Sequence, residues 1–303
     1  MVQGVKNVIV TNDARRYKKP GIVNSIAGFY AGSAAQAVVA SATIPVSIFA
    51  IKNIRKMNEG INNAEISKAI KDAMEISGIN QKGVKLNTFS PKSNLSIRGV
   101  YVEYSEFLKN LILRSMSSGK PIKGDITAHF LKFYIRHGYN GAFEPKNNRI
   151  YINIDKMGTS TFHEIGHAIN RNASIFWRSM QKLRAPMTLA AIALPMIALL
   201  KCKKAEGEEP KGIIDKTTTF IKNNVGKLTA LTFVPIVAEE LMATSRGNAL
   251  AKKVLSPELA SKVIKTNRFS SMIYILTGMT SVAGAYLANA VRDSIAKPKE
   301  IKQ

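Results

Sequence analysis

Residues 149–169 read RIYINIDKMGTSTFHEIGHAI, and this stretch constrains the fold more than any other part of the chain. The alternation in 149–154 is typical of a β-strand, and 142–145, just before a turn, predict its hairpin partner. The hydroxyl-rich residues 158–161 can cap the free amides at the start of a helix. Apolar residues flank the polar ones in 162–169, so we expect a buried helix after the strand.

The predicted helix carries the pattern His-Glu-x-x-His at His163, Glu164 and His167. Residues four apart lie one turn apart on the same helix face, so both imidazoles can bind one zinc ion. Glu164 lies beside them and can accept a proton from a water molecule that the metal has acidified, which makes it the candidate general base. A chance pattern on a surface helix is the alternative, but two unliganded histidines would be costly in an apolar environment. The pattern therefore predicts a catalytic Zn²⁺ site.

Two histidines need at least one more protein ligand, and no histidine follows His167. Glu239 and Glu240 are candidates because they stand at the end of an apolar segment, 228–238, which carboxylates rarely enter without a partner. An apolar helix at 185–200 that leaves the site, and a return through 228–238, would bring the pair back beside the histidines. The residues alone do not choose between the two carboxylates, and a helix cap or an ion pair is the plainer alternative.

Residues 149–250 resemble the YugP-type neutral zinc metallopeptidases. The shared order is a strand, a helix with the sequence FHEIGHAI, an apolar helical hairpin and the motif Glu-x-x-Ala followed by a small residue. More distantly it is similar to HtpX-type and CAAX-prenyl-type membrane metallopeptidases. In this pattern the ligand glutamate precedes an alanine by three residues, and a small polar residue follows. Glu240 and Ala243 match it, whereas Glu239 would put a methionine at the alanine position. The resemblance therefore implies a gluzincin-type endopeptidase, with peptide or protein substrates that include membrane proteins, and the zinc ligands His163, His167 and Glu240.

The composition is that of a folded protein, with 46% hydrophobic and 21% charged residues. Its one cysteine, Cys202, excludes an internal disulfide. A formal net charge of +24 favours a polyanionic partner, either nucleic acid or an anionic membrane surface. The basic residues lie in segments that alternate with uncharged ones, and no nucleic-acid-binding motif accompanies them. We therefore expect membrane lipids as partners and no nucleic acid.

Four stretches are almost free of charge. Residues 21–51 and 272–291 are long enough to span a bilayer. Residues 185–200 and 228–238 are shorter and fit either spanning helices or buried helices of a soluble protein. The pattern predicts a multi-pass membrane protein. The positive-inside rule does not choose its orientation, because basic residues are abundant on both sides, so the cytosolic placement of the active site rests on the resemblance.

These stretches divide the chain into four predicted parts. Residues 1–51 form a basic segment and an apolar helix, and residues 52–184 form a soluble zincin-like unit. Residues 185–250 form an apolar helical hairpin that returns the third zinc ligand. Residues 251–303 form a helix, a C-terminal apolar helix and a basic tail.

Within the soluble unit, amphipathic periodicity predicts helices at 64–76, 102–115 and 126–137. Asn63 and Asp125 are the predicted caps of the first and third, and residues 79–100 predict a loop because they are rich in Lys, Asn, Ser and Gly. His129 and His137 lie about 80° apart around the third helix, too far to share a metal ion.

Tyr151 and Asn153 lie on the strand that precedes the zinc helix. In zinc peptidases an edge strand at this place commonly pairs with an extended substrate, and such pairing needs no particular side chain. We therefore expect this strand to border the substrate.

Together these features predict a mainly α-helical, membrane-associated zincin-like metallopeptidase with a small β-hairpin before the His-Glu-x-x-His helix. The alternative from another class is a non-catalytic membrane protein in which the zinc site is structural. Glu164 argues against this alternative, because a structural site needs ligands but no base.

Overall fold

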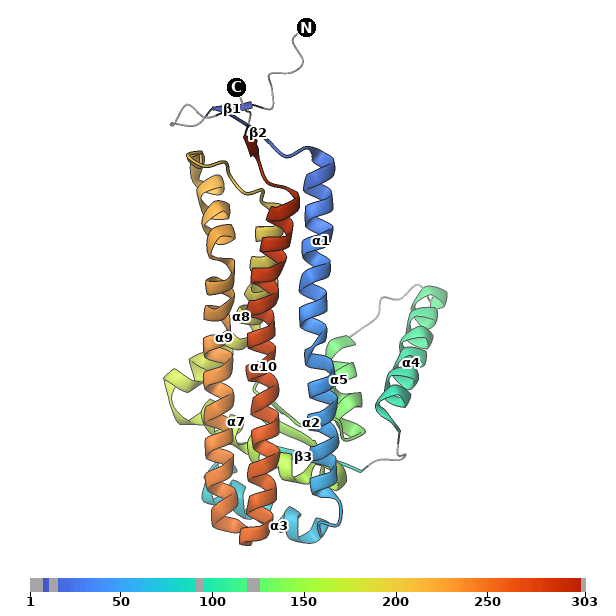
Figure 1. Ribbon diagram of the computed structural model, residues 1–303. Coiled ribbons are helices and arrows are strands. Elements are labelled where there is room, and N and C mark those ends of the chain that lie inside the picture. The colour runs from blue at the N-terminus through green and yellow to red at the C-terminus, as the bar shows by residue number, and fades with distance from the viewer. Residues whose placement is uncertain (1–7, 11–15, 91–94, 119–125, 301–303) are drawn as a thin grey trace. The chain divides into compact units, whose positions relative to one another are not determined.

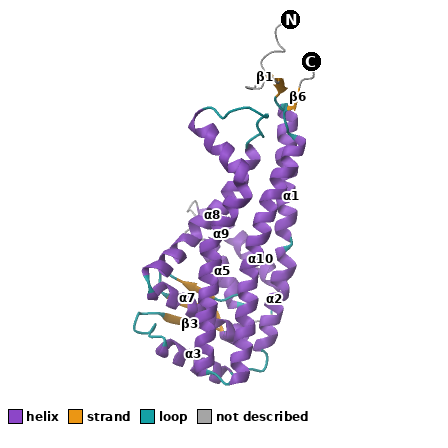
Figure 2. Cartoon of the chain, turned by 60° about the vertical axis from the view of Figure 1, so that its left-hand side comes forward, coloured by secondary structure: helices purple, strands orange, loops and turns teal. Residues whose placement is uncertain are grey.

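The computed structural model is mainly helical, and its described residues contain two three-stranded sheets (Figures 1 and 2). It describes residues 8–10, 16–90, 95–118 and 126–300, so the predicted cap Asp125 lies outside the described residues. The chain forms two compact units. The first contains residues 1–46, 182–238 and 273–303, and the second contains residues 47–181 and 239–272.

The first unit contains the most apolar parts of α1 (Ile22–Ser41), α8 (Ile175–Leu200), α9 (Gly212–Val254) and α10 (Pro257–Ile295). Small residues allow close approach of these helices, since a Cβ added at Gly32 would overlap Leu199 and the carbonyl of Ala288. The strands β1 (Val8–Val10), β2 (Arg16–Lys18) and β6 (Lys299–Glu300) form an antiparallel sheet in the same unit.

Four helical segments are long and apolar enough to cross a membrane: Ile22–Asn58, Ile175–Leu200, Gly212–Val254 and Pro257–Ile295. Each exposes large apolar side chains, for example Ile22 (80%), Leu189 (69%), Leu231 (63%) and Met279 (63%). Exposed apolar surface of this extent is costly in water and favourable in lipid. The helices are thus compatible with the predicted membrane protein, and the two shorter uncharged stretches belong to helices longer than predicted.

α9 differs most from its prediction. The helix does not end at Glu239 and Glu240 but continues to Val254, and the non-helical backbone of Asn224 (φ −120°) interrupts it earlier. Leu, Met and Ala follow the glutamate pair and are strong helix formers. The two carboxylates therefore stand in the interior of a long helix.

The second unit contains the other sheet, in the order β3-β5-β4. β4 (Ala142–Glu144) and β5 (Arg149–Asn153) form the predicted hairpin. β3 (Lys85–Phe89) pairs parallel with β5, so the prediction that all of 79–100 is loop is wrong. Its stabilising partner lies more than 60 positions away in the chain, beyond the reach of local patterns. β5 is the central strand with both sides paired, so the strand that carries Tyr151 and Asn153 cannot offer a free edge to a substrate.

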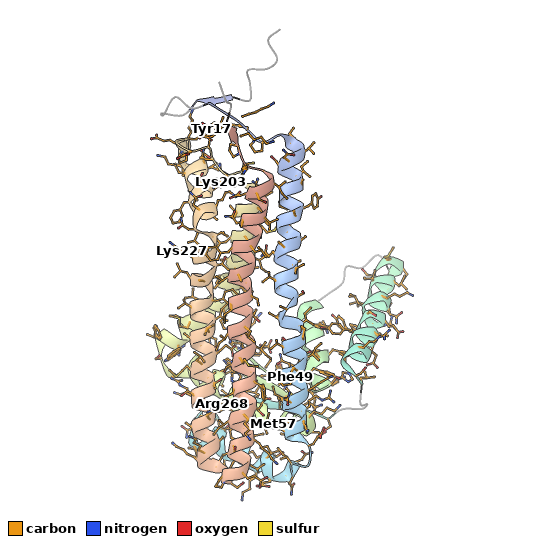
Figure 3. The ribbon with its side chains drawn as sticks, viewed as in Figure 1. Tyr17, Phe49, Met57, Lys203, Lys227 and Arg268 are labelled. Atoms are coloured by element: carbon orange, nitrogen blue, oxygen red, sulfur yellow. The ribbon has the colours of Figure 1, made fainter. Side chains whose placement is uncertain are left out.

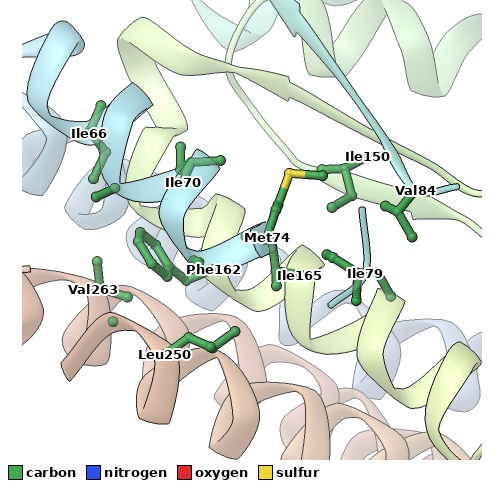
Figure 4. Close-up of a cluster of buried hydrophobic side chains, with 14 residues drawn as sticks. Ile66, Ile70, Met74, Ile79, Val84, Ile150, Phe162, Ile165, Leu250 and Val263 are labelled. Carbon is green, nitrogen blue, oxygen red and sulfur yellow. The ribbon is translucent and has the colours of Figure 1, made fainter. Parts of the chain in front are cut away.

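α3 (Asn63–Ile76) and α7 (Thr161–Ala173) cover one face of this sheet. Their apolar side chains pack with Ile150 of β5 and with the two long helices in a single cluster (Figure 4), whose labelled members are Ile66, Ile70, Met74, Ile79, Val84, Ile150, Phe162, Ile165, Leu250 and Val263. Full burial of one such side chain contributes about 1.5–3 kcal/mol. The cluster thus fixes α7 against α3, the sheet, α9 and α10.

The structure contains the other helices predicted for this unit, with different bounds. α4 (Ile97–Ser118) is longer than predicted, and α5 (Ile126–Arg136) ends before Gly138, whose φ is +72°. The cap of α3 is Asn62 and not Asn63: the Asn62 side chain accepts a hydrogen bond of 2.9 Å from the Ala64 amide. α2 (Thr43–Asn58) packs on α10, where the rings of Phe49 and Phe269 meet edge to face at 6.1 Å; Phe49 is labelled in Figure 3.

Candidate metal centre

α7 follows a turn that two buried hydrogen bonds hold in place. α6 (Ile154–Met157) and a 3-10 turn (Gly158–Ser160) lead into it from β5. The predicted hydroxyl cap is absent at Ser160, whose side chain makes no cap hydrogen bond. Instead, Asn58 at the end of α2 donates to Thr159 Oγ1 (2.8 Å) and accepts from the Thr159 amide (2.9 Å). These buried bonds set the direction of α7 just before its first histidine.

α7 and α9 touch backbone to backbone at two glycines. A Cβ added at Gly166 would overlap the carbonyl of Ala243, and one added at Gly247 would overlap the carbonyl of Phe162. The missing side chain of Gly166 thus allows this close packing. This approach brings the carboxylates of α9 within reach of the histidines of α7.

Three donor atoms converge between the two helices. Nε2 of His163 lies 3.0 Å from Nε2 of His167 and 3.0 Å from Oε2 of Glu240, and Nε2 of His167 lies 3.5 Å from the same oxygen. Donors bonded at 2.0–2.1 Å to a tetrahedral zinc ion lie about 3.3 Å apart. The three side chains are only 1–6% exposed. Two imidazoles and one carboxylate with this spacing fit a zinc ion and leave a fourth position open.

Glu239 contacts the opposite side of the histidine pair. Its Oε1 lies 2.8 Å from Nδ1 of His167 and also accepts hydrogen bonds from Asn170 (2.9 Å) and Gln181 (3.3 Å). With Nε2 directed toward a metal, Nδ1 of His167 carries the proton and donates it to this carboxylate. Neighbouring residues of a helix project about 100° apart, so adjacent glutamates reach different nitrogens. The geometry thus gives Glu240 the position of a candidate ligand, whereas Glu239 supports His167.

His163 has a support of its own. Its Nδ1 lies 3.1 Å from the hydroxyl of Thr244, which is hydrogen-bonded in turn to Ser271 of α10. Both imidazoles are therefore held at Nδ1, which fixes the ring orientation and directs Nε2 of each toward the position that a metal ion could occupy.

Glu164 is also buried at the site. One of its oxygens and a ring nitrogen of each histidine all lie within 4.8 Å of one another. On its other side the carboxylate faces Gly141, just before β4, where an added Cβ would lie 3.3 Å from the Glu164 Cγ. Glu164 is thus buried beside the two histidines, near enough for its carboxylate to interact with an ion that they could hold.

The two carboxylates around His167 favour the protonated form of its imidazole. Burial lowers the pKa of its imidazole, but the charges and hydrogen bonds of Glu240 and Glu239 outweigh this and raise it to about 10. A bound cation would take the place of this proton among the same carboxylates, so metal binding at neutral pH releases it.

The structure brings all four predicted site residues together in the second unit, namely His163, Glu164, His167 and Glu240. Sequence reasoning missed the supporting residues Asn170, Gln181 and Thr244. Thr244 lies four positions after Glu240, and Asn170 three positions after His167, so helical spacing could have identified both. Gln181, on α8, has no such signal.

The other two histidines do not join the centre. His137 is buried against Phe133, with ring centroids 4.7 Å apart, and its Nε2 lies 3.8 Å from Glu103. His129 is exposed on the same helix. Both are ordinary helix residues with respect to the metal, as predicted.

Comparison of the chain with models of known protein families, with curated proteins and with solved structures finds no match. The functional interpretation therefore rests on the residues and their geometry.

Proposed function

We propose that the protein is a membrane-associated zinc endopeptidase of the gluzincin type. His163, His167 and Glu240 hold the metal, and Glu164 is the general base. The observation that carries the proposal is the triangle of two Nε2 atoms and one carboxylate oxygen, 3.0–3.5 Å apart, with a buried carboxylate beside it. Bound zinc would supply a Lewis acid for the scissile carbonyl and would lower the pKa of its water.

The chain's own residues then move the proton. Glu164 accepts it from the attacking water and delivers it to the nitrogen of the leaving amine as the peptide bond breaks. Thr244 and Glu239 keep the two imidazoles oriented throughout, because each accepts a hydrogen bond from an Nδ1. Burial of Glu164, which is 7% exposed, limits the orientations that its carboxylate can take before proton transfer.

A structural zinc site in a non-catalytic membrane protein is the rival function. Structural zinc is almost always closed by four protein ligands, usually cysteines and histidines. Here the triangle supplies three, one of them a carboxylate, and the carboxylate of Glu164 lies near both histidines, where it can act as a base. These features favour catalysis.

The proposed setting is a multi-pass membrane protein with the catalytic unit on the cytosolic side. The four apolar helical segments support the membrane setting, and the cytosolic side follows from the family resemblance. The proposed substrates are peptides or proteins, membrane proteins among them. Membrane lipids are the other expected partners, and no nucleic acid is expected.

Purified full-length protein with stoichiometric zinc can test the activity on β-casein and on a library of unstructured peptides, with new termini identified by mass spectrometry. We expect cleavage that 1,10-phenanthroline abolishes and added Zn²⁺ restores. His163→Ala should lose both zinc and cleavage, while Glu258→Gln, on the exposed surface of α10, should keep both. Bound zinc with no cleavage of any substrate would favour the structural site.

A further inference from the structure

A cavity of about 290 Å³ lies in the second unit and shares no residue with the metal centre. It opens between α4 and α5, which lie side by side (Figure 1), and β3 closes one end of it. Four aromatic and three basic side chains line it: Phe89, Tyr104, Phe107, Phe133, His129, Lys132 and Arg136.

The walls are aromatic and come from facing elements. Tyr104 of α4 lies 5.7 Å from the ring of Phe133 on α5 and 5.9 Å from that of Phe107 on its own helix. Tyr104 is buried, whereas Phe107 is 44% exposed and stands at the mouth. Aromatic faces of this kind favour an apolar occupant that removes them from water.

The charges of the cavity have one sign. Lys132 and Arg136 are four residues apart, so they lie on the same face of α5, and His129 precedes them by one turn. Arg136 lies over the ring of Phe89 at 5.5 Å and Lys132 over that of Tyr151 at 5.2 Å. Among the described residues that line the cavity, none is acidic. Nearby Glu144, which does not line the cavity, accepts a hydrogen bond from the Tyr151 hydroxyl (3.1 Å), and its charge also interacts with Lys132.

We propose that this cavity binds the acyl chain of an anionic amphiphile, with the negative headgroup on Lys132 and Arg136. An occupant with an apolar body and one anionic end matches the two halves of the lining. A peptide fits less well, because a wall of side chains from two helices offers no backbone partners for its amides, and unpaired amides are costly in an aromatic cavity.

The volume favours one chain over two. Ligand pockets commonly measure about 300–1,000 Å³, and this cavity, at about 290 Å³, lies just below that range. A free fatty acid fits this description, and so does one chain of an anionic phospholipid. The two sources share the chemistry of an alkyl chain with a nearby negative charge.

Tryptophan quenching can test the proposal. The chain has one tryptophan, Trp177, so a Trp177→Phe/Phe107→Trp variant carries a single reporter at the cavity mouth. The full-length variant in phosphatidylcholine nanodiscs is titrated with 9,10-dibromostearic acid, whose bromines quench tryptophan on contact. We expect saturable quenching by the acid. The uncharged methyl ester should need a concentration at least about tenfold higher for half-maximal quenching, because it cannot make the charge-assisted hydrogen bonds.

Lys132→Met/Arg136→Met should remove the preference for the acid over the ester. Lys109→Met/Arg114→Met changes the same charge on α4 away from the cavity and should leave the preference intact. Nanodiscs that contain dibrominated phosphatidylglycerol or dibrominated phosphatidylcholine distinguish a phospholipid from a free fatty acid. Quenching by dibrominated phosphatidylglycerol alone would assign the ligand as an anionic phospholipid. Saturable quenching by the added acid would assign it as a free fatty acid.

Equal quenching by acid and ester, or an unchanged preference in the Lys132/Arg136 variant, would overturn the proposal, since the reporter would then only sense bilayer lipid. Displacement of the acid by an acidic aromatic peptide but not by stearate would also overturn it. If the reporter variant does not fold, a diazirine-bearing palmitate can be crosslinked to the parent chain and mapped by mass spectrometry. Labels on the peptides that contain Phe107 and Phe133 are expected, and labels confined to other peptides would contradict the proposal.

Discussion

Oε1 of Glu239 lies 2.8 Å from Nδ1 of His167, which is the ring nitrogen that does not face the other imidazole. Glu240, the next residue, lies 3.0 Å from Nε2 of His163. Two adjacent carboxylates thus contact the two histidines at chemically different nitrogens. Only the second is placed to share a metal with both rings, and this difference predicts different effects of removing each charge.

Glu240→Gln should abolish stoichiometric zinc binding, because a ligand charge is lost from a three-residue site. Glu239→Gln should weaken zinc binding by only about 10–100-fold, the usual effect of removing a group that supports a ligand. Zinc dissociation constants measured by competition with a chelator would separate the two. Glu258→Gln, an exposed residue of α10, is the matched control and should bind zinc as the parent does. The reverse order of effects would exchange the assigned roles.

Gly166→Ala and Gly247→Ala should both destabilise the protein and reduce its zinc content. Each added methyl group would overlap a backbone carbonyl, of Ala243 and Phe162 respectively, and backbone cannot move aside as a side chain can. Overpacking of this kind costs about 1–3 kcal/mol or more. Thermal unfolding in detergent would show the loss as a lower Tm. Gly158→Ala is the control, because its methyl group would meet Ile66 only at an ordinary 3.5 Å. Parent-like stability of both α7–α9 variants would contradict the close approach.

The candidate metal ligands of α7 could be predicted because their spacing is local. His163, Glu164 and His167 lie within two helical turns, so their spacing alone places them on one face. Glu240 could be predicted for a different reason, because a carboxylate beside an apolar segment needs a partner. The family resemblance then favours Glu240 over Glu239 as the third ligand. The distances between Nε2 and Oε2 agree with that choice, which spacing alone could not make.

The features that the sequence did not reveal depend on distant parts of the chain. β3 is a strand because Lys85–Phe89 pairs with Arg149–Asn153, and this pairing also makes β5 central and not an edge. The continuation of α9 past Glu240 depends on burial of Ala243 and Leu250 against elements far away in the sequence. Gln181 reaches Glu239 across 58 positions. Local propensity contains no information about any of these contacts.

The stability of the second unit should fall as the pH decreases below about 6.5. Burial lowers the pKa of His137, Glu103 opposes this, and Lys156 and Arg136 add to the lowering. A histidine whose pKa is lower in the folded state binds fewer protons there than in the unfolded chain. The contribution of His137 to the free energy of unfolding therefore rises with pH up to about 6.5 and then levels off. Tm measured between pH 5 and 8 should show this slope, and His137→Gln should flatten it. Equal slopes in the two proteins would contradict the assignment.

The protein should stay in the membrane pellet after extraction with alkaline sodium carbonate. Four helical segments are long and apolar enough to cross a bilayer, and their exposed apolar side chains would be costly to transfer into water. Immunoblots of pellet and supernatant would show the partition, with a peripheral protein of the same membranes as the released control. Recovery in the supernatant would mean that these helices do not span.

Hydrolysis per bound zinc ion in Glu164→Gln tests the proposed activity most directly. Glutamine keeps the size of the side chain and its hydrogen bonding but cannot accept a proton, and Glu164 is not a corner of the donor triangle. We predict an unchanged zinc content and a hydrolysis rate lower by about 10²–10⁴-fold, as expected for loss of a general base. Glu258→Gln should cleave at the parent rate. Parent-rate cleavage by zinc-loaded Glu164→Gln would contradict the mechanism.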